Sequence, residues 1–456
     1  MKKNYTEEMI SLLAKSMIGK TFEEINDYQI TEEDYNKGSF GHIFETDVYD
    51  YDINSISAPD FVEAGVELKV TPYKINKNKT LSAKERLVLN IINYMEEYKN
   101  TFYTSHFWFK NNKLEIIWYL HEDNKDKLDF KITNEVLLDL SINEDIKQIE
   151  QDWNTVIKKI REGKAHEISE GDTMYLGACT KGANSSSVRK QPFSDILAKN
   201  RAFCFKNSYM TQLVRKYIGD YSNVEKILTN ENETFDEFVN NVIVEYKGKT
   251  QKELMELFNI DSTAKSVNSI IVSRMFGVKG SLRETEEFLK ANIIPKTIRV
   301  EENGRIKESM SFPAFKYTEL VNQEWETSEL RENLESTKYL FFIFKMENNE
   351  YVFKGIKLWN MPELTLETEV KEMWKKTVDV IRNGDIVKSI DNNGCRETNF
   401  PGTVENKVCH VRPHARDAQD TYPLPVKDKL TGASEYTKHC FWLNNTYKKE
   451  IISEFI

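Results

Sequence analysis

The spacing of apolar residues predicts strands and helices in the first half of the chain. Residues 66–71 alternate strictly between apolar and polar side chains, and a second strand-like run at 114–119 follows a turn at 111–112. Apolar residues recur at helical spacing from residue 6 to residue 18, and again around Trp153. Helices that flank strands in this order indicate an α/β domain, in which helices flank a mixed central sheet.

Three short patterns of the first half recur in the same order in the second half. One is a Gly-Lys-Thr start with Glu three residues after the Thr, the spacing of a helix capping box, and its two occurrences lie 229 residues apart. Another is a Trp ten residues before a Gly, and the third is an aromatic segment that ends in Tyr. The matching pairs are residues 19–24 with 248–253, 153–163 with 374–384, and 203–209 with 441–447. These ordered matches favour a duplicated domain of about 220 residues over unrelated amphipathic segments.

The distribution of charge marks a boundary between two domains. Residues 173–216 hold eight basic side chains and one acidic one, whereas residues 217–246 hold seven acidic side chains and one basic one. We therefore predict a first domain at residues 1–220, an acidic linker region at 221–246 and a second domain at 247–456.

The composition excludes several classes of protein. Acidic residues outnumber basic ones by 73 to 63, so a nucleic acid must be bound by a local patch rather than by bulk charge. Five cysteines without a Cys-x-x-Cys pair argue for a reducing compartment, and against a disulfide framework or a structural zinc site. The N-terminus lacks the apolar core of a signal peptide, and the longest apolar run, residues 339–344, is too short to span a bilayer. We therefore expect a cytoplasmic protein.

The basic segment 173–216 is interleaved with aromatic and small polar residues. This mixture suits contacts to phosphates and base edges, and a solvated basic surface is the alternative. The residues of this segment that we expect to bind DNA are Lys181, Asn184, Arg189 and Lys206.

Two acidic residues and a lysine at the first strand form a candidate catalytic group. On an extended strand, Glu67 and Lys69 project to one face while their apolar neighbours project to the other. Asp60 precedes Gly65, where a bend can return its carboxylate to Glu67. Two converging carboxylates suit Mg²⁺, and an adjacent ammonium can position water or offset charge on phosphorus oxygens, as hydrolysis of a phosphodiester requires. An exposed, salt-bridged strand face is the alternative for an isolated Glu-x-Lys.

Other catalytic classes find little support in the sequence. His42, His106 and His166 lack the spacing of zinc ligands, and neither Gly-x-Ser-x-Gly nor a Cys/His nucleophile motif occurs. Residues 38–41 are not a phosphate-binding loop, because no Gly-Lys-Ser/Thr follows them.

The residues around the candidate catalytic group resemble a known family. Pro-Asp at residues 59–60 with Glu-Leu-Lys at 67–69 is similar to the PD-(D/E)xK nuclease motif. The likeness extends to the MutH family and covers residues 5–216 directly. With the repeat in the second half, the chain resembles the two-copy, GATC-cutting type II restriction endonucleases of that family, which implies two tandem restriction-endonuclease-like domains. The wider segments that carry the likeness are residues 37–41, Glu45, and residues 64–72, 104–106 and 181–184.

The resemblance implies a role for each residue of the site. Asp60 and Glu67 would bind Mg²⁺, and Lys69 would serve the attacking water. Glu45 matches an additional active-site carboxylate, which we include among the metal ligands, and Lys110 matches a lysine that acts near the scissile phosphate.

The resemblance also indicates which residues contact DNA. Lys181 matches a residue that the family aims into the major groove toward a guanine edge. The chain departs from the family at Cys204, where the single-copy relatives tend to place a tyrosine. In the second half, Arg412 and His414 lie near the corresponding position and keep cationic groups, so we expect them to bind DNA.

The second half lacks the catalytic carboxylates. The 229-residue spacing places Arg274, Leu289, Lys296 and Ile298 at the positions of Glu45, Asp60, Glu67 and Lys69. Because lysine and leucine cannot hold Mg²⁺, we predict a second copy that binds DNA without cutting it.

These observations predict a Mg²⁺-dependent type II restriction endonuclease that cuts double-stranded DNA at GATC and leaves 5′-phosphate and 3′-hydroxyl ends. One active site per chain implies self-association on DNA or two successive nicks, with the second copy bound to a further DNA site. A cognate DNA methyltransferase is expected as a functional partner rather than in a complex. The alternatives are a strand-nicking, mismatch-repair-type endonuclease and a DNA-binding regulator that does not cut.

Overall fold

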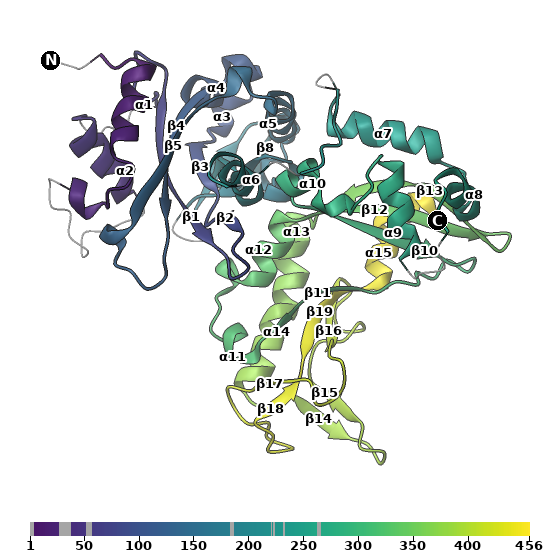
Figure 1. Ribbon diagram of the computed structural model, residues 1–456. Coiled ribbons are helices and arrows are strands. Elements are labelled where there is room, and N and C mark those ends of the chain that lie inside the picture. Colours follow the sequence, from purple (N-terminus) through teal and green to yellow (C-terminus); the bar gives the residue numbers. More distant parts are fainter. Residues whose placement is uncertain are drawn as a thin grey trace. The chain divides into compact units, whose positions relative to one another are not determined.

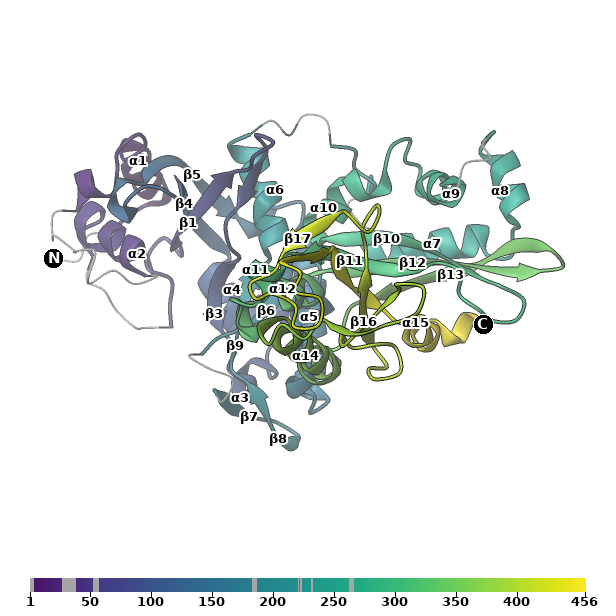
Figure 2. The ribbon, with the colours of Figure 1, turned by 90° about the horizontal axis from the view of Figure 1, so that it is seen from below.

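The chain forms two compact units (Figures 1 and 2). Unit 1 comprises Met1–Phe235 and Glu284–Asn292, and unit 2 comprises Asp236–Arg283 and Ile293–Ile456. The division at residue 235 falls inside the segment that was predicted as a linker. The computed structural model describes residues 4–26, 38–51, 57–182, 187–219, 221, 224–230, 233–261 and 266–456.

The main sheet of unit 1 contains both strands predicted from the spacing of apolar residues. Its order is β2-β1-β4-β5, in which β1 runs parallel to β4 and the other two pairs are antiparallel. The mixed sheet confirms the predicted α/β class. The strands are β1 (Glu67–Ile75), β2 (Leu81–Ala83), β4 (Lys113–Leu120) and β5 (Lys131–Asp139).

Two helices pack against one face of this sheet, where both views show them side by side (Figures 1 and 2). They are α1 (Glu7–Ser16), which Thr6 caps, and the short α2 (Ser39–Ile43). Their buried residues form one apolar cluster with Val66 and Leu68 of the first predicted strand. This packing explains the alternation along the strand, because every second side chain enters the cluster.

A second, smaller sheet of unit 1 has the order β3-β9-β6. Helix α5 packs against it and buries Trp153 completely, as its helical spacing predicted. The strands are β3 (Leu87–Ile91), β6 (Leu176–Thr180) and β9 (Arg201–Phe205), with a hairpin of β7 (Val188–Gln191) and β8 (Ser194–Lys199). The remaining helices are α3 (Tyr94–Glu97), α4 (His106–Asn111), α5 (Ile146–Arg161) and α6 (Asn207–Tyr217).

One helix of unit 1 comes from the second half of the chain. Helix α10 (Glu286–Ala291) packs against α6, and the Ser208 hydroxyl donates to the Lys290 carbonyl at 2.8 Å. The Lys290 ammonium is buried and lies 2.8 Å from Asp145 and 2.5 Å from Glu286. The predicted first domain, residues 1–220, omits this helix. Unit 1 is therefore built from two separate segments of the sequence.

Unit 2 repeats the arrangement of a main sheet and a smaller one. The main sheet has the order β10-β12-β13 and the smaller one β11-β19-β16. The strands are β10 (Ile293–Val300), β11 (Met310–Phe315), β12 (Lys338–Glu347), β13 (Glu350–Trp359), β16 (Cys409–Pro413) and β19 (His439–Leu443), with hairpins of β14 (Val387–Ile390) with β15 (Arg396–Thr398) and of β17 (Thr421–Pro423) with β18 (Glu435–Thr437). The helices are α7 (Phe235–Tyr246), α8 (Gln251–Leu257), α9 (Val267–Met275), α11 (Tyr317–Leu320), α12 (Glu329–Ser336), α13 (Glu363–Thr365), α14 (Lys371–Arg382) and α15 (Asn445–Ile451).

The two main sheets also share their register. Strand β1 is parallel to β4, as β10 is to β12, and β5 is antiparallel to β4, as β13 is to β12. A bulge follows the sixth residue of β4, Trp118, and the sixth residue of β12, Ile343. Thr21 forms an isolated β-bridge with Lys131 of β5, and Thr250 forms one with Val352 of β13. Residues of the two sheets can therefore be matched strand by strand.

The two predicted capping boxes are present, although they open different elements. Thr21 and Glu24 exchange hydrogen bonds before a single 3₁₀ turn at Glu23–Ile25, whereas Thr250 and Glu253 do so at the start of α8. All five cysteines are free thiols. Within the described ranges, no helix combines the length and apolar character needed to cross a membrane.

Candidate active site

Strand β1 presents Glu67 and Lys69 on the face opposite to the apolar cluster. The Glu67 side chain is nevertheless only 3% exposed, so the exposed-face alternative does not apply to it. The Lys69 ammonium lies 2.6 Å from Glu67 Oε1. A buried carboxylate needs a positively charged partner of this kind, because burial removes the water that would stabilise its charge.

A second lysine reaches the same oxygen from another element. Lys110, in the last turn of α4, lies 3.3 Å from Glu67 Oε1 and donates to the Ala58 carbonyl at 3.2 Å. The other carboxylate oxygen, Glu67 Oε2, is buried and has no hydrogen-bond partner. An orphaned, electron-rich oxygen in a buried site is a position where a cation would bind favourably.

Asp60 is brought to this site by the predicted bend. Phe61 and Val66 exchange backbone hydrogen bonds of 2.9 and 3.2 Å around a turn in which Gly65 has a φ of +66°, a conformation that glycine adopts without strain. Asp60 Oδ2 accepts the backbone N–H of Leu68 at 2.9 Å. Burial raises the pKa of Asp60 to about 7, and the charge of Glu67 adds to this effect.

Glu45 lies in a five-residue π-helical segment, Phe44–Val48, that directly follows α2. Burial raises the pKa of Glu45, and the nearby Glu67 raises it further, while Lys69 and Lys110 lower it. These interactions place Glu45 within electrostatic range of the site. Single π-helical turns often occur where a functional side chain is aimed.

The structure thus brings together all five residues predicted to act in catalysis, from four separate elements. In the described part of the chain, no three His, Cys, Asp or Glu side chains form a complete metal cage. Mg²⁺ does not require one, because it is usually held by one or two carboxylates with water and phosphate oxygens completing its shell. The orphaned Glu67 oxygen and the adjacent Asp60 fit that requirement.

The residues predicted to contact DNA in unit 1 differ in exposure. Lys181 is exposed just after β6, and Arg189 is half-buried on β7. Asn184 lies outside the described residues. Lys206 is only 1% exposed, and its ammonium donates to the Thr173 carbonyl. The prediction that Lys206 contacts DNA is therefore wrong, because its charge is committed to the interior of unit 1.

In unit 2, Arg412 and His414 are both exposed at the end of β16. Their neighbour Trp442 was not predicted from the sequence, and its ring contacts both side chains. Only its place in the repeated aromatic segment had drawn attention to it.

The register corrects the alignment of the two halves at the site. Leu114 is the second residue of β4 and pairs with Glu67 of β1. Tyr339 is the second residue of β12 and pairs with Ile294 of β10. Lys69 therefore corresponds to Lys296 rather than to Ile298. The uniform spacing of 229 residues failed because Glu67 lies 46 positions after Thr21, whereas Ile294 lies 44 positions after Thr250.

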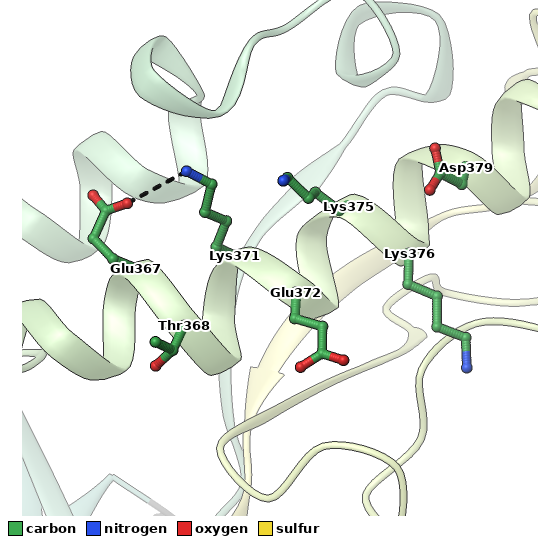
Figure 3. Close-up of a pocket in the computed structure, with 7 residues that line it drawn as sticks. All are labelled: Glu367, Thr368, Lys371, Glu372, Lys375, Lys376 and Asp379. Carbon is green, nitrogen blue, oxygen red and sulfur yellow. Dashed lines mark ion pairs between the residues drawn. The ribbon is translucent and has the colours of Figure 1, made fainter. Parts of the chain in front are cut away.

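The surface of unit 2 also carries a hollow of about 450 Å³ along one helix (Figure 3). Acidic and basic side chains both line it, and Glu367 pairs with Lys371 at 3.6 Å. It contains none of the residues predicted to bind or cut DNA. Its lining residues are Glu367, Thr368, Lys371, Glu372, Lys375, Lys376 and Asp379.

Comparison with known proteins agrees with this geometry. Residues 49–152 match the family described as DNA mismatch repair enzyme MutH, a span that includes Asp60, Glu67, Lys69 and Lys110. The chain is also 37% identical, over 492 aligned positions that cover all of both proteins, to the type II restriction enzyme Sau3AI of Staphylococcus aureus. The chain therefore belongs to the MutH-like type II restriction endonucleases.

Proposed function

We propose that unit 1 hydrolyses phosphodiester bonds of double-stranded DNA at GATC, with Mg²⁺ as cofactor. The observation that carries this proposal is the state of Glu67, whose one oxygen is held by two lysines while the other is buried without a partner. The full-length likeness to a type II restriction enzyme supports the reaction. The GATC site rests on the resemblance to the two-copy enzymes of the family.

Asp60 and Glu67 would hold the metal ion, and Glu45, which the resemblance adds to the ligands, would contribute negative charge within electrostatic range of the site. Each is an oxygen donor, and burial raises the pKa of Asp60 and of Glu45, so a bound cation would stabilise the charged form of both. When bound, Mg²⁺ supplies positive charge close to the phosphate and polarises its oxygens.

The two lysines would act on the reacting groups. Lys69, fixed by Glu67, orients the attacking water, whose oxygen bonds to phosphorus as the bond to the 3′ oxygen breaks. The attacking water loses one proton and the leaving oxygen takes one up, which gives a 3′-hydroxyl and leaves the phosphate on the 5′ end. Lys110 offsets the negative charge that develops on the phosphate oxygens.

We further propose that unit 2 is a divergent copy that binds DNA without cutting it. Its sheet follows the register of unit 1, but Ile294 stands in place of Glu67. One cutting site per chain means that a double-strand break at a palindrome needs two chains or two nicks. Self-association on DNA, with unit 2 at a further site, would meet this need, and a cognate methyltransferase would protect the host DNA.

Supercoiled plasmid with one GATC site, incubated with the protein and Mg²⁺, tests the proposal. We expect linear product with 5′-phosphate ends, and no product when the site is altered, when EDTA is present or when Glu67→Gln replaces the wild-type protein. Open circles alone would support the nicking alternative, and unchanged plasmid would support the non-cutting regulator.

A further inference from the structure

The smaller sheet of unit 2 has one buried face and one partly open face. Along β16 and β19, the inward residues Cys409, Val411, Phe441 and Leu443 belong to the apolar core. The alternate residues, which include Arg412 and Trp442, point to the other face. Arg412 is exposed and Trp442 is half-buried there.

Three side chains form a stacked group on this open face. The guanidinium carbon of Arg412 lies 3.7 Å from the centroid of the Trp442 ring, and the His414 ring lies 5.2 Å from it at 34°. The Trp442 indole N–H donates to the Arg412 carbonyl at 3.3 Å. The ring is held by its own hydrogen bond, so it fixes the direction of the arginine through a cation–π contact.

More positive charge lies close to this group. Lys448 of α15 is buried and donates to the Glu308 carbonyl. Burial lowers the pKa of Lys448 to about 8; the Glu308 carboxylate opposes this shift, and the nearby Arg412 and Lys296 add to it. The Glu308 carboxylate is already paired with Arg299 at 2.5 Å. Of the three remaining cations, Arg412 and Lys296 are exposed, so a phosphate bound at the surface beside them would offset the repulsion between these positive charges.

The corresponding face of unit 1 is closed. By register, Arg412 corresponds to Cys179 and Trp442 to Cys204, and both cysteines are buried. A side chain added at Gly177 would come within 3.0 Å of Glu170 and 3.3 Å of Cys204. Unit 1 thus fills this face with small, packed residues, whereas unit 2 places large cationic and aromatic groups at the same positions.

The backbone adds a further correspondence. The N–H of His414 donates to the Lys438 carbonyl at 2.9 Å, and the N–H of Lys181 donates to the Asn200 carbonyl at 2.7 Å, at the equivalent step of the two sheets. His414 thus occupies the register position of the residue expected to reach a base in unit 1.

We propose that Arg412, Trp442 and His414 form a duplex-DNA site of unit 2, in which the stacked guanidinium of Arg412 reads a guanine edge and the exposed Lys296 attracts the adjacent phosphate. An arginine held in one direction can donate two hydrogen bonds to O6 and N7 of guanine. Lysine cannot reproduce this fork, although it keeps the charge. The inference rests on the proposed function, because it gives residues to the second DNA site of a restriction enzyme.

Binding of short duplexes to the full chain tests this site. In a Lys69→Ala background, which prevents cutting, a duplex with one GATC should bind in two events per chain. We expect Arg412→Ala, Arg412→Lys and Trp442→Ala each to weaken one event by about 10- to 100-fold and to leave the other unchanged. Arg416→Ala is the control, because that arginine is also exposed but pairs with Asp420 at 3.6 Å.

The outcomes separate this inference from the function on which it rests. Two unchanged events in Arg412→Ala would overturn it, as would an equal loss in the Arg416→Ala control. Full binding by Arg412→Lys would overturn guanine reading. Wild-type protein that binds duplexes but leaves GATC plasmid intact would refute the proposed cleavage and leave this site standing. A thermal melt that matches the wild type shows that each variant is folded.

Discussion

The centres of the two main sheets share one backbone arrangement and differ in chemistry. In unit 1, Glu67 is buried between Lys69 and Lys110. In unit 2, the lysine persists as Lys296, while Ile294 replaces the carboxylate. A fold by itself therefore does not carry the activity, which resides in a few side chains placed on it. Under the proposed function, loss of the acid would remove metal binding, while the retained lysine would still attract phosphate.

The opposite face of the same strands shows a second contrast. In unit 1 the fully buried Glu115 lies beside Glu135, and the Ser11 hydroxyl lies 3.4 and 3.3 Å from their carboxylates. The matching residues of unit 2 are Leu340 and Ile356. An apolar pair at these positions stabilises a sheet without the cost of burying charge. Unit 2 therefore shows that the fold does not require acidic groups at the positions where unit 1 has them.

The Lys69→Ala variant is the most direct test of the first contrast, between the active-site residues of unit 1 and their counterparts in unit 2. We expect this change to lower the rate of cleavage by about 10²- to 10⁴-fold with little effect on DNA binding, because the lysine acts in the transition state. Single-turnover cleavage and a binding titration measure the two effects. Lys74→Ala, an exposed change on the same strand, is the control and should cut normally. A Lys69→Ala variant that still cuts would remove this residue from the mechanism.

The core of this site could be predicted because local rules decide it. Strict alternation at residues 66–71 fixes the faces of a strand, and Gly65 permits the bend that returns Asp60. The site of Glu45 needed a family resemblance, since nothing in a helical segment shows that its chain will take a π-helical turn toward the strand.

Long-range packing could not be predicted in the same way. The basic run at residues 173–216 gave no sign that Lys206 points inward, because charge alone does not show which face of a sheet is covered. The return of α10 to unit 1 also escaped detection, since Lys290 finds Asp145 only after the chain has folded. The segments that precede the two first strands differ in length, which hid the match of Lys69 with Lys296.

The discontinuous unit 1 can be tested by Lys290→Met. Removal of the ammonium leaves Asp145 and Glu286 as uncompensated, largely buried carboxylates, which should destabilise unit 1 by about 3–5 kcal/mol. Arg331→Met in unit 2 is the matched change, because Arg331 pairs with Glu335 at 2.8 Å. Calorimetry should show each variant lowering a different melting transition. If both lowered the same one, the assignment of α10 to unit 1 would be wrong.

The acidic pair Glu115 and Glu135 predicts that the stability of unit 1 depends on pH, whereas the apolar pair of unit 2 predicts no such dependence. Burial first, and then Glu135, raise the pKa of Glu115 to about 9. The folded protein then holds a proton that the unfolded chain releases, so stability is lost as pH rises toward that value, by about 1.4 kcal/mol per pH unit. Glu115→Gln should flatten the fall in melting temperature between neutral and alkaline pH and be more stable than the wild type there. Parallel curves would mean that the pair does not share a proton.

The exposed Lys181 sharpens the comparison at the DNA. We expect Lys181→Ala to weaken binding to GATC duplex by about 1–3 kcal/mol, and to relax the preference at one base, because a guanine contact is lost. Lys190→Ala, an exposed change on the adjacent β7, should instead weaken binding to all sequences alike if it affects binding at all. Titration of duplexes altered at one position of the site measures the difference. Equal loss on GATC and random DNA for Lys181→Ala would assign this lysine to the phosphate backbone, and base reading in unit 1 would then depend on other residues.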